Sequence, residues 1–268
     1  MIEGNFHTHT PRCKHAEGSE REYIEEAIKK GFKTLGFSDH TPQPFKDGFV
    51  SSIRMDMDEL DGYIETLLLL REEYRDRIDI KIGLEVEYYP SLFNELMREI
   101  LKRPIEYIIL GQHFVSEETD GFYAGIPTRS ENKLHEYVEL VTEGLKTGYF
   151  SYLAHPDLLN FTGEEDIYRR EMTKLCEYCR DADIPLEVNM FGFTTRRHYP
   201  NERFFGLASG LGCRFVLGCD AHTPDALLQP EEIPGLMRLM ENCRINYETG
   251  YGISRPSALQ SARSAVNA

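Results

Sequence analysis

Short apolar segments alternate with longer segments of helical periodicity along almost the whole chain. The apolar segments favour strands and span residues 2–6, 34–38, 78–86, 107–111, 152–154, 186–189 and 215–218. Helical patterns occupy residues 19–30, 56–74, 91–101, 131–147, 164–182, 201–210 and 231–242. In the first helical segment, Tyr23, Ile24 and Ala27 share one face, and Gly31 follows as a stop signal. About seven strand-then-helix units in series predict a parallel sheet with right-handed crossovers.

Periodicity alone does not distinguish a closed barrel from an open, doubly wound sheet. No linker, repeat or low-complexity block interrupts the pattern, and a barrel of 268 residues is commonly one unit. We therefore expect residues 1–268 to form a single domain. The tail from about residue 253 is small and polar (SRPSALQSARSAVNA), and we expect it to be either poorly ordered or a surface helix.

Composition narrows the class of protein. The 30 basic and 45 acidic residues give a net charge of −15, which argues against a partner such as a nucleic-acid duplex or an anionic membrane. An anionic substrate remains compatible with this charge if a local positive centre, such as a metal cluster, attracts it. No signal peptide or apolar run of membrane-spanning length is visible. The six cysteines are scattered, which indicates reduced thiols and a cytoplasmic protein.

Residues that can bind metals collect at the ends of the predicted strands. In parallel α/β folds the C-terminal strand ends carry the functional groups. In chain order these ends carry His7 and His9 with His15 beyond them, Asp39 and His40, Glu85 and Glu87, His113, His155, Asn189, and Asp220 with His222. Only His135 and His198 of the nine histidines lie elsewhere. A separate structural role is reasonable for any one of the seven, but not for seven on one rim.

The residue types indicate divalent metal ions. Nitrogen and carboxylate ligands without paired thiolates suit zinc, manganese or iron. His7 and His9 are separated by one residue, so an extended chain places both imidazoles on the same side. Seven histidines, one glutamate and one aspartate are too many for one tetrahedral ion. We expect two or three ions with a bridging carboxylate, which would stabilise the attacking and leaving oxygens of a phosphoryl displacement.

Together these motifs resemble the polymerase-and-histidinol-phosphatase (PHP) superfamily. The motifs are H-x-H at residues 7–9, S-D-H at 38–40, G-L-E at 83–85, G-Q-H at 111–113, A-H-P at 154–156 and D-A-H at 220–222. The opening NFHTHTPRCKHAEG is similar in particular to the histidinol-phosphatase branch. The resemblance implies a distorted seven-stranded (β/α)7 TIM-like barrel with a trinuclear metal site at the C-terminal strand ends. It implies one ion held by His7, His9, Glu85 and Asp220, a second by Glu85, His113 and His155, and a third by His15, His40 and His222.

The same resemblance implies a metal-dependent phosphomonoesterase, with L-histidinol phosphate as the first substrate to test. The hypothesis for its mechanism is in-line attack on phosphorus by a hydroxide that bridges two ions. Asp39 would either orient a ligand histidine or pass a proton to the leaving group. In the segment GFTTRRHYP, Arg196, Arg197 and His198 are candidates for phosphate binding, and the resemblance favours Arg197. Solvated loop arginines are the alternative there, and Arg12 and Lys14 in the first loop are further candidates.

One departure from the family pattern bears on the substrate. Histidinol-phosphatase relatives often carry another basic residue shortly after the fifth-strand histidine, whereas HPDLLNFTGEE has Asn160 and no arginine or lysine. A nucleotide or another small phosphate ester is therefore the alternative substrate for the same site. A non-catalytic, metal-binding regulatory module is a third interpretation, against which the complete ligand set argues. The C-x-x-C of Cys176 and Cys179 lies in a helical pattern without a second pair, so we expect no metal there.

Overall fold

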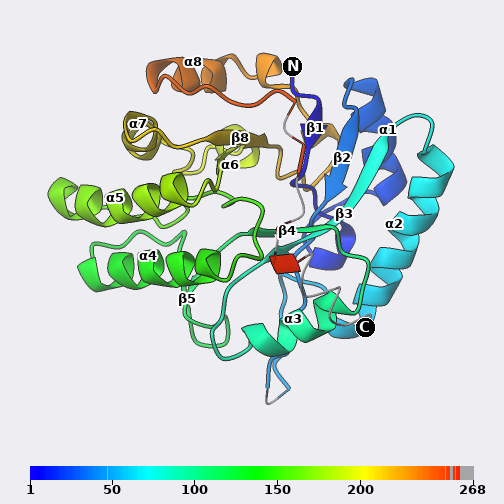
Figure 1. Cartoon of the computed structure of the whole chain (residues 1–268), viewed down its shortest axis with the longest axis horizontal. Helices are drawn as coiled ribbons and strands as arrows, with labels where there is room; N and C mark the ends of the chain where they lie inside the picture. The colour runs from blue at the N-terminus through cyan, green and yellow to red at the C-terminus, as the bar shows by residue number, and fades with distance from the viewer. Residues whose placement is uncertain (47, 251, 254–255, 257, 260–268) are drawn as a thin grey trace.

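The computed structural model describes residues 1–46, 48–250, 252–253, 256 and 258–259. Parallel strands lie at its centre and helices surround them (Figure 1). One parallel sheet has the order β1 (Gly4–Asn5), β2 (Thr34–Phe37), β3 (Asp79–Val86) and β4 (Tyr107–Leu110). A second parallel pair consists of β7 (Leu186–Asn189) and β8 (Phe215–Gly218), and β5 (Phe114–Val115) forms an antiparallel hairpin with β6 (Phe122–Tyr123).

The helices are α1 (Glu20–Lys29), α2 (Leu60–Tyr74), α3 (Phe93–Leu101), α4 (Glu131–Lys146), α5 (Glu165–Asp181), α6 (Met190–Thr194), α7 (Glu202–Gly210) and α8 (Pro234–Asn242). Short 3-10 turns cover η1 (Pro11–Cys13), η2 (Met57–Glu59), η3 (Pro224–Ala226) and η4 (Pro230–Glu232). Helix α1 begins after Ser19, whose side chain and backbone N–H form a reciprocal capping box with Glu22. It buries Tyr23, Ile24 and Ala27, as the periodicity predicted.

Single backbone bridges extend the pairing beyond the named strands. The segment 152–154, predicted as a strand, bridges Leu110 on one side and Leu186 on the other through Leu153. On the opposite edge, a parallel bridge joins Thr8 to Ala221. The backbone N–H of His9 donates to the carbonyl of Ala221 at 3.0 Å, which holds the chain after β1 beside the chain after β8. The sheet is therefore curled, and the prediction of an α/β fold with a parallel sheet is confirmed.

A tyrosine fills the inside of the curl. Tyr107 is fully buried among Phe6, Tyr152 and other interior side chains, and its hydroxyl donates to the carbonyls of Phe6 and Phe37 at 3.0 Å. Gly83 on the neighbouring strand makes this possible, because a Cβ there would lie 2.3 Å from the Tyr107 ring. As in other curled parallel sheets, the interior is a packed core rather than a pore.

The predicted tail falls largely outside the described residues. Within the described ranges, no helix has both the length and the apolar character needed to cross a bilayer. All six cysteines are buried free thiols.

Candidate metal centre

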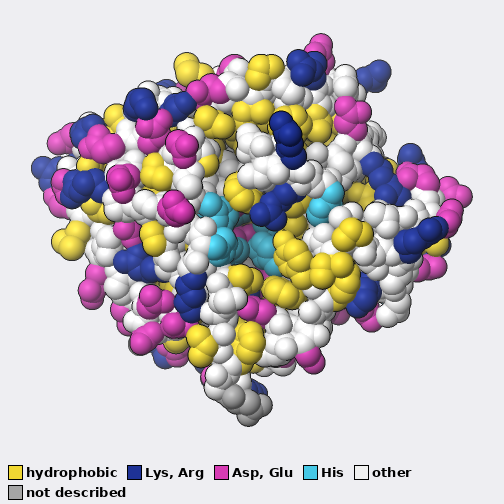
Figure 2. Space-filling view, turned by 180° about the vertical axis from the view of Figure 1, so that it is seen from behind, with side chains coloured by type: hydrophobic (Ala, Val, Ile, Leu, Met, Phe, Trp, Pro, Cys, Tyr) yellow, Lys and Arg dark blue, Asp and Glu magenta, His cyan; other side chains and the backbone are white. Residues whose placement is uncertain are grey.

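Seven histidines converge at the C-terminal ends of the parallel strands. They come from the chain after β1 (His7, His9), the loop after η1 (His15), and the chain after β2 (His40), β4 (His113), the 152–154 segment (His155) and β8 (His222). Figure 2 shows histidine side chains gathered in a hollow at the centre of one face, next to basic and hydrophobic side chains. Neighbouring rings lie close together: the centroids of His9 and His222 are 4.1 Å apart, and those of His113 and His155 are 4.8 Å apart.

Glu85, near the end of β3, is the carboxylate shared by most of these histidines. Its Oε1 lies 2.8 Å from His155 Nε2 and 3.9 Å from His113 Nε2. Its Oε2 lies 3.6 Å from the Nε2 atoms of both His7 and His9. Gly111 leaves space for this carboxylate, since a Cβ at that position would lie 1.8 Å from Glu85 Oε1. A buried carboxylate within reach of several imidazoles is the arrangement expected of a bridging ligand.

Asp220 and His222 complete the cluster from the end of β8. Asp220 Oδ1 lies 3.0 Å from His9 Nε2 and 3.4 Å from His7 Nε2. His222 Nε2 lies 3.1 Å from His15 Nε2. The structure thus brings together all nine residues predicted as metal ligands: His7, His9, His15, His40, Glu85, His113, His155, Asp220 and His222.

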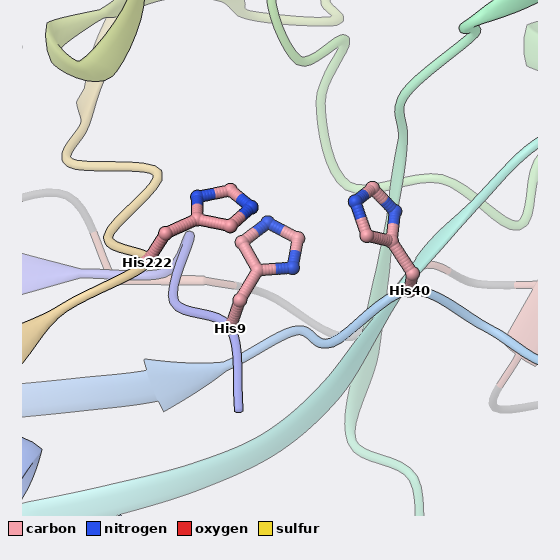
Figure 3. A group of neighbouring side chains, drawn as sticks. All are labelled: His9, His40 and His222. Atoms are coloured by element: carbon pink, nitrogen blue, oxygen red, sulfur yellow. The ribbon is translucent and has the colours of Figure 1, made fainter. Parts of the chain in front are cut away.

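The sets of neighbouring ligand atoms overlap with the predicted groups. Ligand atoms within 4.8 Å of one another include the sets His7–His9–Asp220 and His7–Glu85–His155, which resemble the first two predicted groups. The third predicted group contained His15, His40 and His222, and the ring centroid of His15 lies 5.3 Å from that of His40 and 4.8 Å from that of His222. His9 also forms a set with His40 and His222 (Figure 3). His40 also approaches the centre, with Nδ1 2.9 Å from Glu85 Oε2.

Several buried nitrogen and oxygen atoms at this centre lie near one another but form no well-directed hydrogen bond with a described residue. They include His7 Nε2, His9 Nε2 and Glu85 Oε2. The opposite ring nitrogen of each of these histidines meets a carboxylate: His7 Nδ1 lies 2.7 Å from Glu187 Oε1, and His9 Nδ1 lies 3.4 Å from Asp39 Oδ1. Buried polar atoms are normally satisfied. Imidazoles anchored through one nitrogen with the other left open therefore fit a site for divalent metal ions.

The electrostatics of the cluster follow from the mixture of acids and histidines. Burial alone would raise the pKa of Glu85 and of Asp220, but the surrounding histidines hold the pKa of each well below its usual range. Burial and the charge of His9 lower the pKa of His222 to about 3. The acids are therefore ionised, and the site favours positive charge at its centre.

The cavity above the cluster encloses about 360 Å³. Its walls are formed by His15, His40, His113, Asp220, His222, Ile53, Phe114, Tyr123, Phe191, Arg197 and Tyr199. The Arg197 guanidinium lies over the Phe191 ring, 4.9 Å from its centroid, and makes no ion pair with a described residue. An unpaired guanidinium in this position is available to an anion.

The other predicted phosphate-binding residues do not line this cavity. The Arg12 guanidinium pairs with Glu20 and lies over the Tyr63 ring. Arg196 lines a neighbouring depression, and His198 Nε2 lies 2.7 Å from the Leu158 carbonyl. Lys14 hydrogen-bonds Asp56 at 3.0 Å. Of the phosphate-binding candidates named from the sequence, the structure brings only Arg197 to the cavity.

Asp39 lies behind His9 rather than on the cavity wall. It is fully buried, and besides His9 it accepts hydrogen bonds from the Thr10 hydroxyl and, at 2.8 Å, from the backbone N–H of His40. This placement favours orientation of His9 over proton transfer to a leaving group.

Comparison with known proteins identifies the family. The model of the PHP domain matches residues 5–190. The chain belongs to the PHP family. Its PHP relatives include a probable histidinol-phosphatase of Deinococcus radiodurans, 28% identical over 81% of this chain and 85% of that protein. The histidinol-phosphatase of Bacillus subtilis is 36% identical over a shorter stretch, 46% of this chain and 47% of that one.

A solved structure shares the fold. The histidinol phosphate phosphatase of Lactococcus lactis, crystallised with zinc, L-histidinol and phosphate, superposes with a TM-score of 0.70 at 18% identity. The match covers 96% of this PHP chain and 98% of that one. The curled parallel sheet and its surrounding helices are therefore those of the PHP fold.

Two charged residues around this PHP site were not given a role by the sequence analysis. Glu187 lies in the middle of the buried strand β7, and Arg54 is 1% exposed in the loop before η2. Arg54 pairs with both Glu87 and Glu118, and Glu87 in turn accepts the His113 backbone N–H at 2.8 Å. The signal for Glu187 was present in the sequence, because an acidic residue inside the four-residue strand LEVN needs a polar partner.

Proposed function

We propose that this PHP chain is a metal-dependent phosphomonoesterase whose substrate is L-histidinol phosphate. One observation carries the proposal: the eight other candidate ligands surround Glu85, buried imidazole nitrogens among them lack a hydrogen bond, and the free Arg197 guanidinium lines the cavity above. A centre of positive charge beside an available guanidinium suits a phosphate group. The names of the relatives support histidinol phosphate as the ester.

The metal ions would be two or three divalent cations, of zinc, manganese or iron. His7, His9, Glu85 and Asp220 would hold one ion, and Glu85, His113 and His155 a second. His15, His40 and His222 would hold the third, with His9 close enough to exchange with His15 in that group. When bound, such ions stabilise phosphoryl oxygens and activate water for attack on phosphorus.

The side chains of this protein would do the remaining work. Arg197 would bind the phosphate through its guanidinium, held in place by the face of Phe191. Asp39 would be a positioning residue that holds His9 through Nδ1. Because the molecule carries a net charge of −15, attraction of an anionic ester depends on this local group of cations.

The leaving group would lie against the aromatic wall of the cavity. Phe114, Tyr123, Phe191 and Tyr199 supply ring faces there, together with the aliphatic Ile53. Flat ring systems stack on such surfaces, and the imidazole of histidinol is one of them. A sugar phosphate, whose leaving group is covered with hydroxyls, would find few hydrogen-bonding partners on this wall. Asn160 stands in the stretch after His155 where relatives often carry a basic residue, and its side chain donates to the Gly125 carbonyl at 3.3 Å.

The proposal includes the finer architecture. The bridges at Leu153 and at Thr8–Ala221 support closure of seven parallel segments into a distorted (β/α)7 barrel, and a single domain over residues 1–268. A cytoplasmic role in histidine biosynthesis belongs to the same proposal.

Phosphate release from a panel of esters tests the function. The panel contains L-histidinol phosphate, a nucleoside monophosphate, a short oligonucleotide and a sugar phosphate, each with zinc, manganese or iron. We expect the highest kcat/KM for L-histidinol phosphate. Preference for a nucleotide would refute histidinol phosphate as the substrate but keep the proposed hydrolysis of a phosphate ester. No turnover of any ester with any metal would refute the enzymatic function and favour a non-catalytic, metal-binding module.

Matched arginine variants test the phosphate-binding role. Loss of a charge-assisted hydrogen bond costs about 1.5–3 kcal/mol, so Arg197→Ala should lower kcat/KM by about 10- to 100-fold. The effect should fall mainly on KM if the contact is equally strong in the bound substrate and the transition state. Arg12→Ala is the control, since that guanidinium pairs with Glu20 away from the cavity. Equal kinetics for Arg197→Ala and the wild type would reject the role.

A further inference from the structure

We infer that Glu187 is a positioning residue that fixes the geometry of the metal ligands around His7. The inference rests on the metal site of the proposed function, but not on the identity of the substrate. Glu187 lies in β7 and its side chain is completely buried. It does not line the cavity, so it would act on the ligands rather than on a substrate.

Each carboxylate oxygen of Glu187 meets donors. Its Oε1 lies 2.7 Å from His7 Nδ1. Its Oε2 accepts the backbone N–H of His155 at 2.9 Å and the side-chain amide of Asn189 at 2.9 Å. The Asn189 amide also donates to Asp220 Oδ2 at 3.0 Å. One buried carboxylate therefore contacts two predicted ligands directly and a third through Asn189.

The contact to His7 determines which ring nitrogen faces the centre. A carboxylate only accepts hydrogen bonds, so the proton of the imidazole stays on Nδ1 beside Glu187. The lone pair of Nε2 is then directed to the other side of the ring, where Asp220 Oδ1 lies 3.4 Å away and Glu85 Oε2 lies 3.6 Å away. Histidine ligands of metals are commonly fixed in this way, and loss of the fixing partner weakens metal affinity.

The contact to His155 acts on the backbone. His155 has φ +29°, in the left-handed region that a residue with a Cβ adopts only under constraint. Its N–H is held by Glu187 and its Nε2 reaches Glu85 Oε1 at 2.8 Å. Glu187 thus stabilises an unfavourable backbone conformation that directs this imidazole to the shared carboxylate.

The neighbouring strand is built to accommodate this carboxylate. A Cβ on Gly218 in β8 would lie 1.8 Å from Glu187 Oε1, so any larger residue would displace it. Burying a carboxylate is costly unless it is paired. Among the described residues, the ion-pair partner of Glu187 is His7, and neither an arginine nor a lysine approaches it. The hydrogen bonds to the predicted metal ligands therefore compensate the cost of burying the Glu187 carboxylate.

The test compares Glu187→Gln with Glu171→Gln. Both glutamates are buried and accept hydrogen bonds from three groups, but Glu171 lies on α5 and meets Lys174, His135 and Arg170 instead of the cluster. Glutamine has almost the same shape as glutamate, but its NH2 group can only donate, so it would face another hydrogen-bond donor where the carboxylate oxygen accepts one. Zinc and manganese affinities are measured by competition with a chromophoric chelator, and bound metal is counted by elemental analysis.

We expect Glu187→Gln to bind metal about 10- to 100-fold more weakly than the wild type, whereas Glu171→Gln binds it normally. Lower stability of the metal-free variant with unchanged metal affinity would mean a merely structural role and would overturn the inference. If Glu187→Gln does not fold, Glu187→Asp keeps the charge but shortens the reach, and wild-type affinity in that variant would overturn it equally.

The ester panel separates this inference from the proposed function. A wild-type protein that binds metal but hydrolyses no ester would refute the function, while the affinities of the two variants would still decide the role of Glu187. A wild-type protein that binds no metal would overturn both.

Discussion

The buried guanidinium of Arg54 offers a sharp test of how the loops around the cavity are held. Arg54 pairs with Glu87 at the end of β3 and, through Nε at 2.8 Å, with Glu118 from the β5–β6 loop. It also donates to the Thr41 carbonyl at 3.3 Å. Its neighbour Ile53 lines the cavity, so one side chain ties two loops to the strand that carries Glu85. The change to make is Arg54→Met, which keeps most of the apolar stem and removes the charge.

The magnitude follows from what the change leaves behind. Burial would raise the pKa of Glu87, but Arg54 and His113 hold the pKa well below its usual range, so Glu87 is charged. After the change Glu87 keeps bonds from the Tyr89 hydroxyl at 2.6 Å and the His113 N–H at 2.8 Å but has no arginine. Breaking one partner from a buried ion pair costs about 3–5 kcal/mol. Because Glu87 keeps two donors, we expect the lower part of that range, about 3 kcal/mol.

Urea denaturation followed by circular dichroism measures this loss, with chelator present so that metal binding does not contribute. Arg75→Met is the matched control, since Arg75 is 62% exposed and pairs with Glu72 on the surface. Exposed pairs contribute about 0–1 kcal/mol, so the control should change little. A loss for Arg54→Met no larger than that of the control would refute the argument that the Arg54 pair holds these loops.

Three further predictions follow from individual contacts. Gly111→Ala should displace the Glu85 carboxylate and reduce the amount of bound metal. Gly62→Ala is the control: it lies in open space on α2 and should stabilise the protein by about 0.5–1 kcal/mol. Equal metal content in the two variants would contradict the prediction. Burial would raise the pKa of Glu171, but Lys174 and its other partners lower it to about 2, so its stabilising effect is present above about pH 4.5 and is lost as the pH falls towards 2. The stability gap between wild type and Glu171→Gln, measured by denaturation, should therefore narrow over that interval, and a constant gap would reject the reasoning. Dialysis against a chelator should abolish phosphate release and zinc or manganese should restore it; full activity without metal would sink the metal-dependent mechanism.

The order of elements was predictable because the hydrophobic pattern is local. Each apolar segment and each amphipathic helix buries its own face, so alternation along the chain predicted the parallel α/β fold. The 152–154 segment is an exception in detail, since it contributes single bridges on either side of Leu153 rather than a named strand. Too few residues pair there for the pattern to distinguish a strand from a bridge.

The convergence of the candidate ligands was also predictable, and for a related reason. Parallel strands end at the same edge, so residues that follow strands far apart in sequence, such as His7 and Asp220, arrive at one place. This rule placed the nine candidate ligands at one edge, together with Asp39, Glu87 and Asn189. The resemblance grouped His15 with His40 and His222, and the structure brings His9 to the same two rings as well, because the directions of individual side chains depend on packing.

Only the tertiary structure decided the partners that support the cluster. His7 and Glu187 are separated by 180 positions, and no local pattern relates them. Arg12 was a reasonable phosphate ligand in the sequence, but folding places Glu20 against its guanidinium, while Arg197 stays unpaired on the cavity wall. The sequence thus determined which chemical groups reach the strand ends, because backbone periodicity is local. Which group each one contacts depends on packing between distant segments, and only the folded chain determines that.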